Sequence, residues 1–211
     1  MIISYFGGQF VKIQFGDTVV AFNPISKNSK LKTTKFGADV AILSLNNDDF
    51  NGVDQLVFGD RKPFVLSGPG EYEIKGVFVK GFGNKTNYEK DLEKINTIYS
   101  VVLEGMTVLH LGALSDPKKL PKEALENAEE GVDILLTPIG DNGLMSFSEA
   151  YKLAVNLESK IIIPLSDDEK LIKAFLKEGS GEGIKSIDKL TLKKKDLEGK
   201  NGEIVILSSG I

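Results

Sequence analysis

Aspartates in three short polar segments are the side chains of this sequence whose type and spacing could do chemistry. Asp48 and Asp49 follow an apolar run, Asp141 stands in an Asp-Asn-Gly turn, and Asp167 and Asp168 precede a helical pattern. Carboxylate oxygens suit hard cations such as Mg²⁺, Mn²⁺ and Ca²⁺, and a carboxylate can also act as a general base. Aspartate is equally common in turns and at helix N-termini for local reasons. A cation site and an ordinary structural role are therefore both open.

The groups that usually build zinc sites and nucleophilic hydrolases are scarce. The sequence has no cysteine and one histidine, His110, inside the apolar run 108–111. A histidine there is more often a hydrogen-bonded core residue than a general base, and both roles stay open. No Gly-x-Ser-x-Gly elbow occurs, and the segment 81–86 lacks the spacing of a phosphate-binding loop. The residues alone therefore name no catalytic nucleophile.

Length and composition predict one globular domain over residues 1–211. Hydrophobic residues make up 41% of the chain and charged residues 27%, and no break in composition marks a boundary. The net charge of −4 argues against a nucleic-acid partner. No apolar run approaches the ~20 residues of a membrane span, and the start lacks a signal-peptide pattern. Together with the absence of cysteine, these features predict a cytoplasmic location and no membrane partner.

The apolar pattern predicts strands in both halves of the chain. Alternation with period two predicts a hairpin of strands 11–15 and 18–22, joined by a Gly-Asp turn. Fully apolar runs at 39–43, 132–136 and 161–163 predict strands that are buried on both faces. Further strands are expected at 64–66, 76–79, 97–103, 106–111, 189–192 and 203–207.

Helices and loops are expected between these strands. The segment 121–130 has a helical pattern, and possible capping boxes at 146–149 and 166–169 each precede an apolar helical stripe. The polar segment 84–94 is expected to be an exposed loop. Mixed sheets covered by helices explain this pattern better than an all-β sandwich, so the sequence predicts an α/β fold.

The order of several sequence blocks resembles the metallo-β-lactamase superfamily. The blocks lie at 4–10, 22–24, 39–50, 68–77, 109–113, 133–140 and 161–166. The likeness covers roughly residues 2 to 180 and is nearest to the branch of L-ascorbate-6-phosphate lactonase and related zinc-dependent hydrolases. It implies a four-layer αβ/βα sandwich. In that fold two mixed β-sheets pack face to face, helices lie outside, and the active site is at one edge of the sheets.

The resemblance also implies where metal ligands would lie, and this sequence departs from the family there. The family's His-x-His-x-Asp-His motif falls on residues 45–50, where Leu45, Asn47 and Phe50 replace the three histidines. Only Asp49 keeps the family's residue.

The remaining ligand positions are replaced as well. Ala113 stands at the bridging aspartate and Ser166 at the last histidine. The early Gly-His pair is Gly7-Gly8, and no histidine occurs near 81–87. Zinc sites in proteins are built from imidazole, thiolate or carboxylate ligands at tetrahedral spacing. We therefore expect no cofactor: zinc is not expected, and only a weak Mg²⁺, Mn²⁺ or Ca²⁺ site is considered.

Two hypotheses for function follow, and whether the protein is an enzyme is left open. The first is a non-catalytic module with a degenerate active site, a pseudoenzyme that binds an unknown small molecule or protein. Its cleft would be lined by Asn47, Asp49, Asp141 and Ser166. The alternative is a metal-dependent hydrolase of a phosphorylated or lactone substrate, which uses a hard cation held by carboxylates. A structural role in a homo-oligomer is a third, weaker hypothesis.

Overall fold

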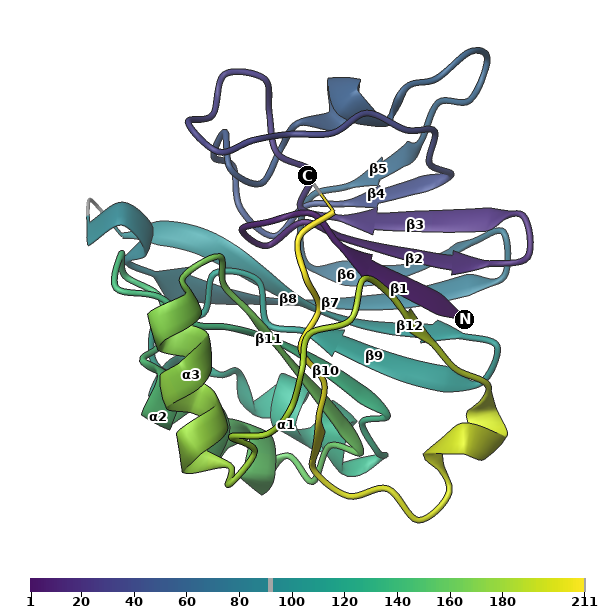
Figure 1. The fold of residues 1–211 in the computed structure, drawn as a ribbon. Helices are drawn as coiled ribbons and strands as arrows, with labels where there is room; N and C mark the ends of the chain where they lie inside the picture. Colours follow the sequence, from purple (N-terminus) through teal and green to yellow (C-terminus); the bar gives the residue numbers. More distant parts are fainter. Residues whose placement is uncertain (91–92, 211) are drawn as a thin grey trace.

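Two β-sheets pack face to face in the computed structural model, which describes residues 1–90 and 93–210 (Figure 1). The first sheet is mixed, and antiparallel pairs at β12, β1, β2 and β3 give way to parallel pairs at β4 and β5. Its strands, in spatial order, are β12 (Leu190–Thr191), β1 (Ile2–Tyr5), β2 (Val11–Phe15), β3 (Thr18–Phe22), β4 (Val40–Ile42) and β5 (Phe64–Leu66).

The second sheet is also mixed, with parallel strands at one side and an antiparallel meander at the other. Its strands, in spatial order, are β13 (Glu203–Ile204), β11 (Ile161–Leu165), β10 (Ile134–Pro138), β9 (Met106–His110), β8 (Lys94–Leu103), β7 (Val77–Thr86) and β6 (Gly70–Ile74). Two mixed sheets packed face to face match the predicted α/β sandwich, so the fold prediction is confirmed.

The main core lies between the sheets and explains the alternation in the sequence. In β2 the side chains of Val11 and Ile13 point into this core, whereas Lys12 and Gln14 are only half-buried. Strand β10 is buried along its whole length, because one face meets the first sheet and the other meets the helices. Burial on both faces is the physical reason why such strands read as unbroken apolar runs.

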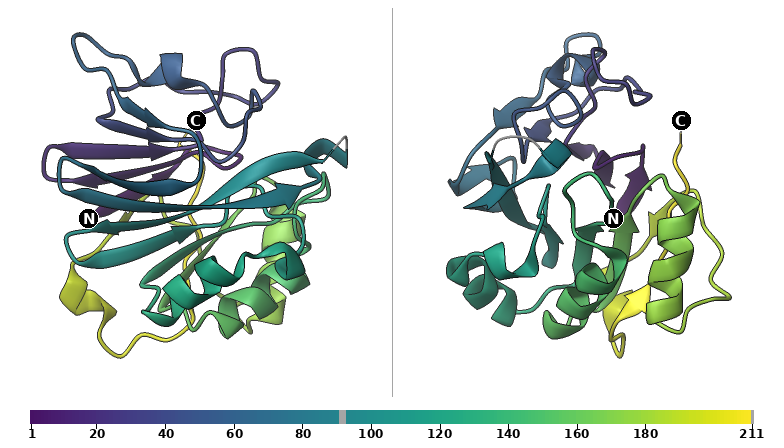
Figure 2. Two further views of the ribbon diagram at one scale, coloured as in Figure 1. Left: turned by 180° about the vertical axis from the view of Figure 1, so that it is seen from behind. Right: turned by 90° about the vertical axis from the view of Figure 1, so that its left-hand side faces the viewer.

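The outer faces of the two sheets are covered differently. The helices α1 (Lys122–Glu129), α2 (Phe147–Asn156) and α3 (Glu169–Glu178) pack on the second sheet (Figure 2). The first sheet is covered by loop residues and by the short 3₁₀ helix η1 (Val53–Leu56), which enclose a smaller apolar cluster. Within the described residues, no helix combines the length and apolar character needed to cross a bilayer.

The prediction of an exposed loop over 84–94 is wrong at both ends. Strand β7 continues to Thr86, and β8 begins at Lys94. The polar side chains are buried there because they satisfy one another: Asn96 Nδ2 donates to Asn84 Oδ1 over 2.7 Å, and the Thr86 hydroxyl donates to the carbonyl of Ala113. Residues 91–92 of the predicted loop lie outside the described part of the chain.

The helix starts were predicted with partial success. Ser146 and Glu149 form the expected capping box at α2. The second capping box was wrong, because Asp168 is the N-cap of α3 and its carboxylate accepts from the Lys170 N–H. Asp167 makes contacts elsewhere, and these belong to the site described next.

Candidate functional site

A cleft of about 280 Å³ is formed by loops that follow several strands of both sheets. Three of the four predicted site residues, Asp49, Asp141 and Ser166, line it, together with Asp167 and Asp168. The loops after β4, β10 and β11 supply these residues. Four aspartates from segments far apart in the sequence therefore line one cleft.

Asn47, the fourth predicted residue, is not among the lining residues of the cleft. Its Oδ1 accepts from the Asp49 N–H over 2.8 Å, and its Nδ2 donates to Glu89 Oε2 over 2.7 Å. Asn47 therefore shapes the loop that carries Asp49 and does not face a ligand itself.

Asp49 is fixed by two hydroxyl groups. Its Oδ2 accepts from the Tyr88 hydroxyl over 2.6 Å, and its Oδ1 accepts from the Ser29 hydroxyl. Burial, with the hydrogen bond and the negative charge of Asp49, raises the pKa of Tyr88 far above its ordinary value. Tyr88 thus remains a proton donor, and the carboxylate of Asp49 keeps one orientation.

Asp167 is fixed in a similar way on the opposite side of the cleft. Its Oδ2 accepts from the Gly8 N–H over 2.7 Å, and its Oδ1 accepts from the buried Tyr5 hydroxyl over 3.2 Å. Burial, together with Asp167, raises the pKa of Tyr5 well above its ordinary value. Gly7 has φ of +88°, and a Cβ there would lie 3.2 Å from Asp167 Oδ2. Glycine therefore suits this turn, because it allows the carboxylate to approach the backbone.

Three of the positions that the resemblance assigns to metal ligands come together in space, and they form an apolar cluster. Leu45, Phe50 and Ala113 are all buried and pack with Tyr88 and Leu144. The rings of Phe50 and Tyr88 meet edge to face, with centroids 5.1 Å apart. These side chains offer no imidazole or carboxylate at the positions of the zinc ligands, so an imidazole-bound zinc ion does not fit them. Across residues 1–90 and 93–210, no three His, Cys, Asp or Glu side chains are grouped so as to hold a metal ion.

His110 is a core residue that lies outside the lining of the cleft. Its Nδ1 accepts from the Gly112 N–H over 2.9 Å, so the proton belongs on Nε2, which is 3.3 Å from the carbonyl oxygen of Gln9. The ring also stacks on Phe22, with centroids 5.1 Å apart. Burial lowers the pKa of His110 to about 4. Of the two roles left open by the sequence, the geometry supports the hydrogen-bonded core residue.

Sequence reasoning missed two residues of the cleft, Gln9 and Tyr88. Gln9 is only 4% exposed, its Nε2 donates to the carbonyl of Leu165, and its Oε1 has no hydrogen-bond partner among the described residues. Tyr88 lay in the segment predicted as an exposed loop, yet it is buried. No local pattern marks either residue, since both are buried by contacts with distant parts of the chain.

Comparisons with known proteins identify a family and a curated relative with similar sequences. A family model described as "Beta-lactamase superfamily domain" matches residues 2–166. A curated relative from Bacillus licheniformis, named a UPF0173 metal-dependent hydrolase, is 26% identical over an alignment 200 positions long. The match covers 78% of this chain and 84% of the relative.

Solved structures show the same fold. A candidate Zn-dependent hydrolase of the metallo-β-lactamase superfamily from Thermotoga maritima has a TM-score of 0.70 at 23% identity, covering 98% of this chain and 97% of its own. Igni18, a metallo hydrolase from Ignicoccus hospitalis, has a TM-score of 0.60 at 14% identity, covering 91% and 99%. CmlA, a diiron β-hydroxylase from Streptomyces venezuelae, has a TM-score of 0.63 at 9% identity, covering 98% and 53%.

The prediction of no cofactor is contradicted by these relatives. The Bacillus licheniformis protein is named metal-dependent, the Thermotoga maritima protein Zn-dependent, and CmlA a diiron enzyme. Our prediction rested on the missing histidines. Their absence excludes only an imidazole ligand set, because oxygen donors hold other ions. The names of the relatives favour the hydrolase alternative over the non-catalytic module.

Proposed function

This chain belongs to the β-lactamase superfamily domain family, and from that membership we propose that it is a metal-dependent hydrolase of a phosphorylated or lactone substrate. Placement near the L-ascorbate-6-phosphate lactonase branch is part of the proposal. One observation supports the proposed site more than any other: the carboxylates of Asp49, Asp141, Asp167 and Asp168 line one cleft. The proposal keeps the single domain over 1–211 and the cytoplasmic location that the sequence predicts.

A hard cation suits the donors of this cleft better than zinc does. Mg²⁺ is usually held by one or two carboxylates, and water and substrate phosphate oxygens complete its coordination. Asp141 and Asp168 are the residues that would hold it, since Asp141 is exposed and Asp168 uses only Oδ1 for its capping bond. When bound, such an ion would neutralise a substrate phosphate or polarise a lactone carbonyl.

The fixed carboxylate of Asp49 is the proposed base. Each of its oxygens accepts one hydroxyl, and a carboxylate oxygen has a second lone pair. Asp49 can therefore accept a further hydrogen bond from a water molecule and take its proton. Gln9 Oε1 adds an acceptor that could bind a hydroxyl group of the substrate.

Thermal shift and activity with added cations test this proposal. The full chain would be measured with Mg²⁺, Mn²⁺ or Ca²⁺ added after chelator treatment, with p-nitrophenyl phosphate and a γ-lactone as substrates. A cation at 100 times its Kd should add about 2.7 kcal/mol to the free energy of unfolding. Asp141→Asn and Asp168→Asn should remove most of that gain, and the exposed Asp60→Asn should keep it. The proposal fails if no cation shifts the melting temperature and neither substrate is hydrolysed.

A second function, binding of a small molecule or a protein without catalysis, is favoured by one specific observation. Leu45, Phe50 and Ala113 fill the space where the family's ligands would lie. Binding would then use the same cleft. Saturable binding of a substrate analogue without turnover, in the presence of every cation tested, would support this function over the hydrolase.

A further inference from the structure

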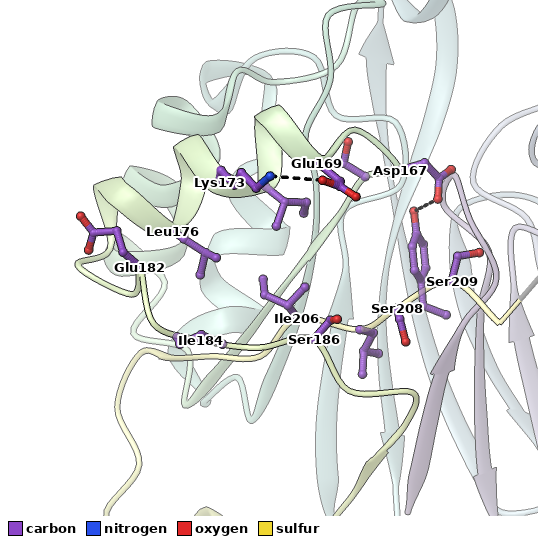
Figure 3. Close-up of a pocket in the computed structure, with 14 residues that line it drawn as sticks. Asp167, Glu169, Lys173, Leu176, Glu182, Ile184, Ser186, Ile206, Ser208 and Ser209 are labelled. Atoms are coloured by element: carbon purple, nitrogen blue, oxygen red, sulfur yellow. Dashed lines mark hydrogen bonds and ion pairs between the residues drawn. The ribbon is translucent and has the colours of Figure 1, made fainter.

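A second groove of about 430 Å³ adjoins the acidic cleft (Figure 3). It runs between α3 and the C-terminal segment, which includes residues 182–186 and 206–209. Ser166 and Asp167 line both the groove and the cleft, so the two spaces meet at these residues. A molecule held in the groove at this end would therefore lie beside Asp167, which also lines the cleft.

One part of the groove is apolar. Leu176 of α3 faces Ile184 and Ile206 of the C-terminal segment across it, and Ile172 of α3 is a further apolar lining residue. Ile184 is 37% exposed, so part of its side chain is open to a molecule in the groove. Apolar walls with a few polar groups are typical of small-molecule sites of this volume. The apolar part of the groove therefore suits the alkyl or aryl part of a ligand.

The other part of the groove is polar. Figure 3 shows Asp167, Ser208 and Ser209 gathered at one end, whereas Leu176, Ile184 and Glu182 lie towards the other. The Ser208 hydroxyl donates to Asp188 Oδ1 over 2.9 Å, so its oxygen keeps lone pairs that can accept a hydrogen bond.

The charge of the groove is negative. Lys173 is the one cation among its lining residues, and its Nζ is paired with Glu169 Oε2 at 3.2 Å. Asp167 accepts from two neutral donors, the Tyr5 hydroxyl and the Gly8 N–H, and no described cationic side chain forms an ion pair with it. The N-terminus of α3 is a poor site for an anion, since the Asp168 carboxylate caps it and the acidic Glu169 lies in its first turn.

We infer that this groove binds the apolar arm of an organic ammonium ion, and that Asp167 fixes the ammonium group where the groove meets the cleft. The alkyl or aryl body lies along Leu176, Ile184 and Ile206, and the ammonium donates to Asp167 and to the serine hydroxyl oxygens. The assignment of this cation to the substrate of the cleft rests on the proposed function, but the binding itself does not. The substrate class is thereby narrowed to phosphorylated or lactone compounds that carry an amine on an apolar chain.

Binding of three probes of equal length tests the inference. Hexylammonium, hexanol and hexanoate would be titrated into the full chain by calorimetry with no cation added. We expect saturable binding of hexylammonium and at least about tenfold weaker binding of hexanoate, because a charged hydrogen bond is replaced by repulsion. Equal binding of hexanoate, or no saturable binding of hexylammonium, overturns the inference.

Two variants separate the head of the probe from its tail. Asp167→Asn should weaken hexylammonium about tenfold while leaving hexanol unchanged. Ile184→Ser should weaken both hexylammonium and hexanol severalfold. Ile187→Ser is the matched control, since Ile187 is 41% exposed in the same segment and does not line the groove. If Asp167→Asn does not fold, two tests of the inference remain. They are the comparison of Ile184→Ser with Ile187→Ser and the comparison of the three probes.

The outcomes distinguish this inference from the proposed function. Cation-dependent hydrolysis without hexylammonium binding would support the proposed hydrolase function and overturn the inferred ammonium site in the groove. Hexylammonium binding with no hydrolysis in the presence of any tested cation would support the ammonium site and contradict the proposed hydrolase function.

Discussion

At the scale of single residues, the cleft depends on neutral donors that hold charged acceptors. Tyr88 and Ser29 orient Asp49, while Tyr5 and Gly8 orient Asp167. In each case a buried tyrosine with a raised pKa stays protonated, and its hydroxyl holds the carboxylate in one orientation. Fixed carboxylates of this kind lose little mobility when they bind a cation or a donor, so the cleft is arranged in advance of its ligand.

Tyr88→Phe is expected to destabilise the protein by about 2 kcal/mol, because it removes a hydrogen bond to a charged group. Urea denaturation at pH 7 measures this loss. Tyr72→Phe serves as the control, since the Tyr72 hydroxyl donates only to backbone carbonyls near the surface. Equal losses of stability in the two variants would contradict the larger contribution expected from the hydrogen bond between Tyr88 and Asp49.

We expect the protein to lose stability in mild acid, because His110 is buried and its pKa is lowered. Its pKa is about 4 in the folded protein and about 6.5 in an unfolded chain. The unfolded state therefore binds more protons between these values, and stability falls as the pH drops from about 6.5 towards 4. The full effect is about 3 kcal/mol at pH 4.

Comparison with His110→Gln isolates this contribution from that of the carboxylates. The variant should show a smaller change in the free energy of unfolding between pH 7 and pH 5 than the parent protein. Parallel curves for the two proteins would rule out a histidine that stays neutral in the folded state.

At the scale of helices and strands, local sequence was a good guide where local physics decides. The apolar runs at 132–136 and 161–163 became β10 and β11, and Ser146 with Glu149 formed the capping box of α2. Segment 84–94 was misjudged because Asn84 and Asn96 pair across β7 and β8, a contact that no window of sequence contains. Asp168 became the N-cap in place of Ser166 because Asp167 is held by Gly8, which is 159 residues away in the sequence.

Ser146→Ala tests the capping box at the element scale. The variant should lose about 1 kcal/mol of stability, because the N-cap hydroxyl satisfies a backbone N–H of the first turn. Ser148→Ala, in the first turn of the same helix, should change stability by less than about 0.5 kcal/mol. Thermal denaturation of the two variants provides the comparison, and a larger effect at Ser148 would reverse the assignment.

At the scale of the whole molecule, one carboxylate links the two sheets. Asp39, at the start of β4, accepts from Lys75 Nζ over 2.7 Å, from the Val19 N–H over 2.8 Å and from Arg61. Lys75 stands in the turn between β6 and β7, so the contact crosses from the first sheet to the second. Burial opposes the charge of Asp39, but these hydrogen bonds hold its pKa below the ordinary value.

Asp39→Asn should cost about 3 kcal/mol, since it leaves Arg61 and Lys75 without their buried partner. Both cations are well exposed, which places the value at the lower end of the usual range. Asp54→Asn, which loses an exposed pair with Lys27 at 3.8 Å, should cost less than about 1 kcal/mol. Because the folded pKa is lowered, the parent loses this contribution only as the pH falls below about 4. A parent protein whose acid unfolding matches that of the variant would refute the link.

The candidate site was half predictable for the same reason as the fold. Asp49, Asp141 and Ser166 were placed in the cleft from the order of sequence blocks, and the loops that carry them, after β4, β10 and β11, do line one cleft. Gln9 and Asp167 gained their roles only when β1 met the loop after β11. Those contacts join the two ends of the chain and depend on the complete fold.

His110 also provides an NMR probe of the contact between the two sheets. The chain has one histidine, so its imidazole gives a single set of NMR signals that needs no assignment. The ring lies on β9 of the second sheet, stacks on Phe22 of β3 in the first, and faces the Gln9 carbonyl beside the cleft. Any ligand that shifts the Gln9 loop would move this one resonance, and the protein thus carries its own reporter of occupancy.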